Sequence, residues 1–158
     1  MMKRLFVCLI LFALSVAVQG SPPQKAVASN PKTVINDQKA KQMLIGQHRF
    51  SLQWISWDYF GKANVTEAKG TLFMKGEQKG RGNTDYLTLD GVITTVDAKE
   101  FIFKGTIITQ VSHINGGKPC KREGEMTFKI TGSRKYWRLQ EMDNPCEGVT
   151  DYVDVFFR

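Results

Sequence analysis

Two alternating stretches decide the fold class of this chain: residues 100–111 read EFIFKGTIITQV and residues 124–131 read GEMTFKIT. In both, apolar side chains recur with a period of two, which places them on one face of an extended strand. The turn signal NGG at residues 115–117 lies between the two stretches. The sequence therefore predicts two neighbouring antiparallel strands, the first of which can bend at Gly105.

The same pattern continues outward on both sides. Further strands are expected over residues 48–55, around Leu72 and Met74, around Leu87 and Leu89, and over residues 92–96, 136–140 and 152–157. The glycine-bearing stretch 76–84 is expected to end one strand, and Asp90-Gly91 to form a bulge or a hairpin turn. Seven to eight strands joined by short turns predict an all-β fold, a single antiparallel meander closed as a small barrel. A β-sandwich is the alternative.

Three tripeptides bear on the kind of barrel. Residues 46–48 are Gly-Gln-His, and Thr-Asp-Tyr occurs at residues 84–86 and again at 150–152. In architecture, the barrel expected over residues 48–158 resembles the calycin group, which includes the lipocalins. Lipocalins open with Gly-x-Trp and carry Thr-Asp-Tyr late in the barrel, so these tripeptides depart from the lipocalin pattern. The resemblance implies a calycin-like barrel and transfers no functional residue.

The first twenty residues have the pattern of a secretory signal peptide. A basic head, Met1–Arg4, precedes the apolar run Leu5–Val18 and the small-x-small signal at residues 18–20. The run of about fourteen residues is shorter than the roughly twenty that cross a bilayer as a helix. We therefore expect cleavage before Ser21, no transmembrane segment in the mature chain, and a periplasmic or secreted protein.

The mature chain is expected to hold one domain behind a lead-in. Residues 21–45 form the lead-in, with a possible short helix that starts with Asn30 as N-cap and Pro31 at its first position and stops at Gly46. Residues 46–158 form the barrel domain.

Cleavage of the leader would leave two of the three cysteines, Cys120 and Cys146. An even pair in an oxidising compartment predicts one disulfide. Each cysteine follows a proline, which places both in loops rather than in strands. The closed loop of about 27 residues would stabilise the fold by roughly 3 to 3.5 kcal/mol.

Positive charge is unevenly distributed. Loss of Lys3 and Arg4 with the leader lowers the formal net charge from +7 to +5. The segment 118–138 is basic and the segment 139–158 acidic, so the charges largely cancel if the two form adjacent strands. Export argues against a nucleic-acid partner. The possible basic face consists of Lys118, Lys121, Arg122, Arg134, Lys135 and Arg138.

Aromatic residues crowd the end of the strand expected over residues 48–55. They are Trp54, Trp57, Tyr59 and Phe60. Trp54 and Trp57 have opposite parity, so both cannot face one core without a bulge. An exposed cluster at a barrel mouth would suit an apolar or carbohydrate ligand or a protein partner. The alternative is that these rings plug one end of the core.

The sequence shows no arrangement of catalytic residues. His48 and His113 lack a nucleophile or metal-spaced partner nearby and are interpreted as isolated surface histidines. The acids Asp143, Glu147, Asp151 and Asp154 match no EF-hand spacing and are interpreted as ordinary loop acids. No metal or cofactor is expected. Asn64-Val65-Thr66 is an N-glycosylation sequon, which matters only in a eukaryotic host.

Two functions fit these features. The first is a non-enzymatic binding protein for a small apolar or amphipathic ligand, within the barrel or at its mouth. The second is an interaction or inhibitor module that binds an envelope or extracellular protein through its edge strands and basic face. An enzyme is the least favoured class.

Overall fold

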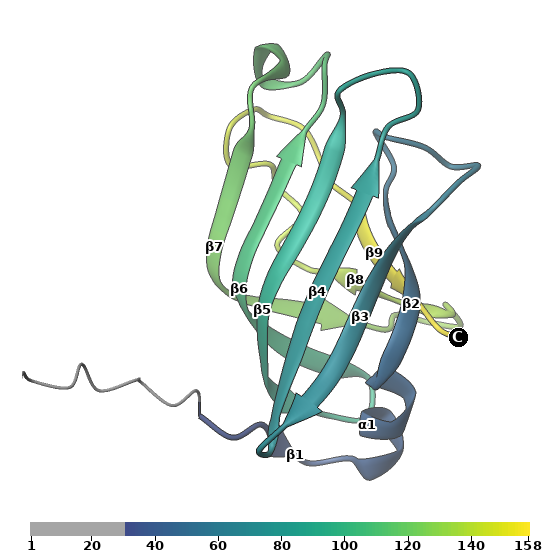
Figure 1. Ribbon diagram of the computed structural model, residues 1–158, viewed down its shortest axis with the longest axis vertical. Helices are drawn as coiled ribbons and strands as arrows, with labels where there is room; N and C mark the ends of the chain where they lie inside the picture. Colours follow the sequence, from purple (N-terminus) through teal and green to yellow (C-terminus); the bar gives the residue numbers. More distant parts are fainter. Residues whose placement is uncertain (1–30) are drawn as a thin grey trace, which may run out of the picture.

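The computed structural model describes residues 31–158, so the predicted leader and the first ten residues of the lead-in lie outside the described range (Figure 1). Within this range the chain forms one α-helix, one 3-10 turn and nine strands. These elements are β1 Val34–Ile35, α1 Gln38–Leu44, β2 Gly46–Leu52, β3 Gly61–Ala68, β4 Thr71–Lys79, β5 Tyr86–Val96, β6 Glu100–Gln110, η1 Asn115–Gly117, β7 Cys120–Lys129, β8 Tyr136–Leu139 and β9 Val153–Phe156.

Strands β2 to β9 form a closed barrel. Each of these strands pairs antiparallel with the next along the chain, and β9 also pairs with β2 through Phe50 and Val155. The structure confirms the predicted up-and-down barrel, with eight strands, and excludes the sandwich. The ninth strand, β1, lies outside the barrel and pairs parallel with the end of β5.

Residues 31–45, which precede β2, pack against the barrel. Asp37 caps α1, because its carboxylate accepts a hydrogen bond of 2.7 Å from the Ala40 amide. The helix therefore begins at Gln38, and not at Pro31 as the sequence suggested, because residues 34–36 are held along β5. Ala40 and Leu44 are buried in the core. Figure 1 shows α1 beneath the barrel, at the end away from the long loops.

Strand β3 was not predicted from the sequence, and several other strands have different ends from those expected: β2, for example, spans Gly46–Leu52 rather than residues 48–55. Only Ala63 and Val65 of β3 are buried, so its apolar period is too short to stand out. Strand β4 continues through Gly76, and β5 runs without a turn through Gly91. Gly91 lies opposite Gly105, where a Cβ atom on Gly91 would lie 2.4 Å from the Lys104 carbonyl oxygen. Gly91 thus permits close contact between β5 and β6 within the sheet.

Apolar side chains from all eight strands pack together in the barrel interior. The rings of Phe101 and Phe128 stack with centroids 5.0 Å apart, and Trp137 meets Phe101 edge-on at 5.9 Å. All three side chains are buried. Each large side chain that is fully buried stabilises the fold by about 1.5–3 kcal/mol. Phe157, expected to face the interior, is only partly buried because β9 ends at Phe156.

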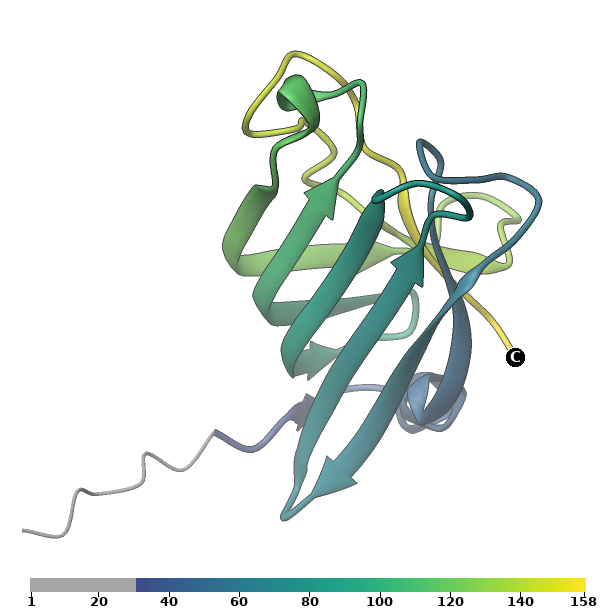
Figure 2. The same ribbon diagram turned by 45° about the horizontal axis from the view of Figure 1, so that its top comes forward.

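Four connections lie at the end of the barrel opposite α1: residues 53–60, 80–85, 111–119 and 140–152. We call this the loop end. In Figures 1 and 2 the connection from β6 to β7 and the connection from β8 to β9 lie side by side there. This is the arrangement expected of alternate loops in a meander.

Candidate functional site

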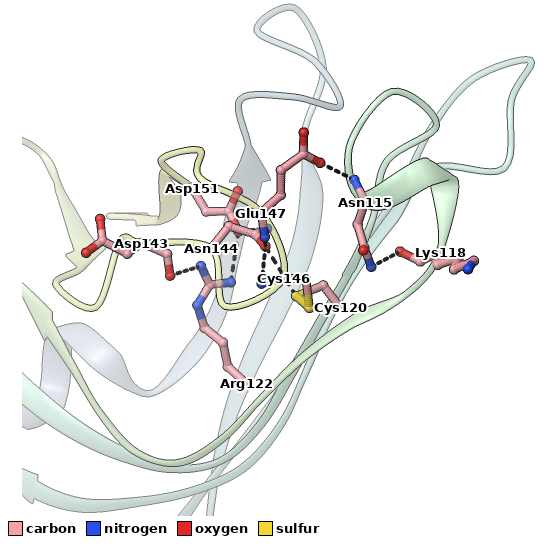
Figure 3. The surroundings of a disulfide bond; sticks show 9 residues. All are labelled: Asn115, Lys118, Cys120, Arg122, Asp143, Asn144, Cys146, Glu147 and Asp151. Carbon is pink, nitrogen blue, oxygen red and sulfur yellow. Dashed lines mark hydrogen bonds and ion pairs between the residues drawn. A yellow bond between two sulfur atoms is a disulfide. The ribbon is translucent and has the colours of Figure 1, made fainter.

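A disulfide joins Cys120 to Cys146 at the loop end (Figure 3). The two Cα atoms are 6.0 Å apart, within the range that such a bond requires. The predicted pairing is therefore confirmed. The prediction that both cysteines lie in loops is wrong for Cys120, which is the first residue of β7 and pairs with Thr109. Its preceding proline stays just outside the strand, where the missing N–H removes no ladder hydrogen bond.

Asp151 is the centre of a buried polar network beside the disulfide. Its carboxylate accepts hydrogen bonds from Trp54 Nε1 at 3.1 Å and from Asn144 Nδ2 at 2.9 Å. Arg122 Nη1 lies 2.9 Å from Asp151 Oδ2 as an ion pair, but it is not aligned for a hydrogen bond. Asp151 is fully buried, so these partners compensate a charge that would otherwise be costly there.

The same network fixes the connection between β8 and β9. Asn144 Oδ1 accepts hydrogen bonds from the backbone amides of Cys146 at 2.9 Å and Glu147 at 3.2 Å. The Glu147 carboxylate accepts from the Asn115 amide, which ties this connection to the one that carries η1 (Figure 3). The loop end is therefore held by one covalent bond and several polar contacts, so binding there would not need to order it first.

Two of the four acids interpreted as ordinary loop acids, Asp151 and Asp154, are buried, and Asp154 lies within β9. Asp151 and Asp154 are buried against arginines, and the Asp143 backbone carbonyl accepts from Arg122 Nη2 at 2.9 Å. Among residues 31–158, no group of three or more His, Cys, Asp or Glu side chains could hold a metal ion.

The residues of the expected basic face do not form one exposed surface. Arg122 and Arg138 are buried, each in an ion pair with an aspartate. Lys121 is exposed and lies 2.7 Å from Glu123. Lys118 is exposed in the connection from β6 to β7, whereas Arg134 and Lys135 are exposed together in the connection from β7 to β8. The charge count over residues 118–138 did not separate the two faces of β7: Arg122 has the same parity as the buried Met126 and Phe128, whereas Lys121 points outward.

Arg138 has a particularly tight partner. Its Nε and Nη2 atoms each donate a hydrogen bond of 2.7 Å to the Asp154 carboxylate. Hydrogen bonding to Asp154 raises the pKa of Arg138, and burial opposes the rise. Both side chains point to the outer side of the sheet, yet Asp154 is only 2 % exposed. The Tyr152 ring covers the pair, with the Arg138 guanidinium 4.1 Å from its centroid.

The four aromatic candidates do not form one cluster: Trp54 and Trp57 line the same groove, whereas Tyr59 and Phe60 contact other residues. Trp54 follows the end of β2 and is half-buried, so the parity comparison with Trp57 does not apply. Trp57 is 67 % exposed. The Arg81 guanidinium lies over the ring of Tyr59, whereas Phe60 packs edge-on against Phe156 on the outer face of the barrel.

Trp54 and Trp57 line one groove together with Gln53, Val149, Thr150 and Tyr152. We call it the loop-end groove, and its volume is about 460 Å³. Gln53 is held by two other lining residues, because its side chain donates to the Thr150 carbonyl at 2.6 Å and accepts from the Tyr152 amide at 2.7 Å. The lining of the groove therefore includes a fixed amide side chain and an exposed indole ring.

The two histidines differ in exposure: His48 is buried and His113 is exposed. His48 is buried, contrary to the interpretation as a surface residue, and its two ring nitrogens lie 2.7 Å and 2.9 Å from the carbonyl oxygens of Leu44 and Phe156. Both carbonyls accept a hydrogen bond when the ring is doubly protonated, and one does when it is neutral. His113 is exposed and meets Trp54 edge-on at 5.9 Å.

The fold and the disulfide define a small, closed antiparallel β-barrel protein. The chain belongs to the PM1083 family, whose sequence profile matches residues 32–157. It is similar to the "Uncharacterized protein PM1083" of Pasteurella multocida (strain Pm70), with 44% identity over 149 residues, 93% of this chain and 96% of that protein. No solved structure matches the chain significantly.

Two structural facts bear on the compartment. None of the helices formed by residues 31–158 is both long and apolar enough to span a bilayer. The Cys120–Cys146 disulfide is compatible with export, because disulfides persist in oxidising compartments.

Proposed function

We propose that this chain is an exported, non-enzymatic binding protein that takes a small apolar or amphipathic ligand in the loop-end groove. The observation that carries the proposal is Trp57, a tryptophan that is 67 % exposed beside a fixed groove. Small-molecule sites are concave, with apolar and aromatic walls and a few fixed polar groups. A groove of about 460 Å³ is within their usual range of roughly 300–1,000 Å³.

The packing of the barrel favours the mouth over the interior. The side chains of Phe50, Phe101, Phe103 and Phe128 are 0 % exposed and occupy the space that a ligand inside the barrel would need. The signal-peptide pattern and the disulfide support export to the periplasm or the medium.

A neutral fluorescent probe tests the proposal. N-phenyl-1-naphthylamine is titrated into the wild type, Trp57→Ala and Val34→Ala, where Val34 is the other large apolar side chain that is strongly exposed in the described range. We expect saturable binding that Trp57→Ala weakens at least tenfold and Val34→Ala leaves unchanged. Equal binding by all three proteins would show that the probe does not bind in the loop-end groove.

An interaction module remains the second candidate function, because tryptophan and arginine are enriched among residues that anchor protein interfaces. It would be favoured if the wild type bound no neutral probe but captured an envelope protein that Trp57→Ala failed to capture. Export is tested by expression of the full chain in a Gram-negative host. Mass spectrometry of the periplasmic protein should give a chain that starts at Ser21 and carries one disulfide.

A further inference from the structure

A second groove, with a volume of about 740 Å³, lies along the outer face of β2 and the start of β3. Arg49, Lys62, Arg158, Phe60 and Phe157 are among the residues that line it, and we call it the basic groove. It shares no lining residue with the loop-end groove. None of the residues that line it is acidic.

Arg49 and Lys62 are directly opposite each other in the register of β2 and β3. Like charges at such positions destabilise a sheet, whereas opposite charges stabilise it. Within residues 31–158, neither side chain forms an ion pair. Glu77, which lies opposite Lys62 on β4, pairs instead with Lys79 at 3.1 Å. Arg49 and Lys62 are thus two adjacent cations, neither of which has an ion-pair partner among residues 31–158.

These cations are positioned without acidic partners. The Arg49 guanidinium lies 4.8 Å from the ring centroid of Phe60 and 5.2 Å from that of Phe156, so aromatic rings hold it. Arg158 Nη2 donates a hydrogen bond of 2.9 Å to the Gln42 carbonyl. A Cβ atom on residue 46 would lie 3.0 Å from Arg158 Nη1, and Gly46 has a φ of +115°, so glycine keeps this space open.

We propose that the basic groove binds a soluble anionic amphiphile, a small molecule with a carboxylate or phosphate head and a short apolar body. The head would lie between Arg49 and Lys62, with Arg158 contributing further positive charge. The apolar body would rest on Phe60 and Phe157. Charge complementarity and the two phenyl rings together select this class over a simple inorganic anion.

A free molecule fits the groove better than a bilayer surface does. The volume of about 740 Å³ corresponds to one small ligand.

Octyl phosphate is the probe, followed by ¹H–¹⁵N NMR of the full mature chain. We expect saturable shifts at the amides of Gln47–Arg49, Gly61–Lys62 and Phe157–Arg158, with at least tenfold tighter binding than inorganic phosphate. Octyltrimethylammonium, with the same chain and the opposite charge, should leave these amides unshifted. Equal affinity for octyl phosphate and inorganic phosphate, or shifts confined to the loop end, would overturn the proposal.

Two double variants of equal net charge complete the test. Lys62→Gln with Arg158→Gln should weaken octyl phosphate binding at least tenfold. Lys99→Gln with Lys118→Gln removes two exposed charges outside the groove and should leave binding within twofold. Thermal melting of the unliganded proteins checks folding, and Lys62→Gln alone should not lower the midpoint, because it relieves the repulsion with Arg49. A groove variant that melts normally and binds octyl phosphate like the control contradicts the assignment.

The last experiment measures binding of the wild type and the groove variant to vesicles that contain anionic lipid. Groove-dependent binding to vesicles that exceeds binding to octyl phosphate would identify a membrane ligand and refute a soluble one. The proposal stands apart from the loop-end groove, since the neutral probe reports on Trp57 and octyl phosphate on Lys62 and Arg158.

Discussion

Trp54 donates a hydrogen bond from Nε1 to Asp151 Oδ1 over 3.1 Å, although 97 residues separate the two positions along the chain. This bond joins the first connection of the barrel to the last. Arg122, from β7, lies against the same carboxylate. Asp151 therefore holds three parts of the loop end in one arrangement, and the shape of the loop-end groove depends on it.

Asp151→Ala should be among the most destabilising substitutions in the loop end. It leaves the buried guanidinium of Arg122 without its charge partner, a change that typically costs about 3–5 kcal/mol. Asp90→Ala is the matched control, because Asp90 forms an exposed ion pair with Lys75 at 3.4 Å. Such a pair contributes about 0–1 kcal/mol. Urea unfolding at neutral pH measures both, and similar losses would show that Asp151 is not the centre of the network.

Removal of the disulfide should lower the free energy of unfolding by about 3 to 3.5 kcal/mol, on the chain-entropy estimate for this loop length. The measurement is urea unfolding of the wild type with and without a reductant. The double variant Cys120→Ala with Cys146→Ala is the control, because the reductant should not change its stability. A reductant effect of equal size in that variant would show that the loss does not arise from the Cys120–Cys146 bond.

The fold class could be predicted from the sequence because the strands of the meander have one strongly apolar face. Phe101, Phe103 and Ile107 are all buried, as their spacing indicated. Strand β3 could not be found this way, because six of its eight residues are polar, small or charged and partly or fully exposed. Its position is determined by pairing with β2 and β4 rather than by its own pattern.

Less of the candidate site than of the fold could be predicted from the sequence. The Cys120–Cys146 pair followed from composition and compartment alone. The network around Asp151 joins residues 54, 122, 144 and 151, which no local spacing connects. The basic groove was missed for the same reason, since Arg49 and Lys62 become neighbours only in the register of β2 and β3.

Gly91 and Gly105 should be intolerant of any side chain. A Cβ atom on Gly105 would lie 2.4 Å from the Asp90 carbonyl oxygen and 2.7 Å from the Gly91 Cα atom. Gly105→Ala therefore forces β5 and β6 apart and should cost at least about 1–3 kcal/mol, as overpacking does. Gly148→Ala is the control, because nothing lies within 4 Å of a Cβ atom there. Thermal unfolding compares the two, and equal midpoints would contradict the close packing of these strands.

Arg138→Met should destabilise the barrel by about 3–5 kcal/mol, because it leaves the buried Asp154 carboxylate uncompensated. The double variant Arg138→Met with Asp154→Leu removes both charges and should recover most of this loss. Urea unfolding of the two single variants and the double variant measures the coupling. Additive losses would show that the bidentate pair is not a coupled unit.

The pH dependence of this pair follows from the raised pKa of Arg138. A cation whose pKa is higher in the folded state contributes stability that is complete below its unfolded pKa and is lost only as pH rises through the folded pKa. For arginine that window lies far above neutral pH. The stability difference between wild type and Arg138→Met should therefore stay constant from pH 7 to about pH 10. Unfolding curves at three pH values in this range test it, and a difference that shrinks toward pH 10 would show that Arg138 loses its charge in the folded protein.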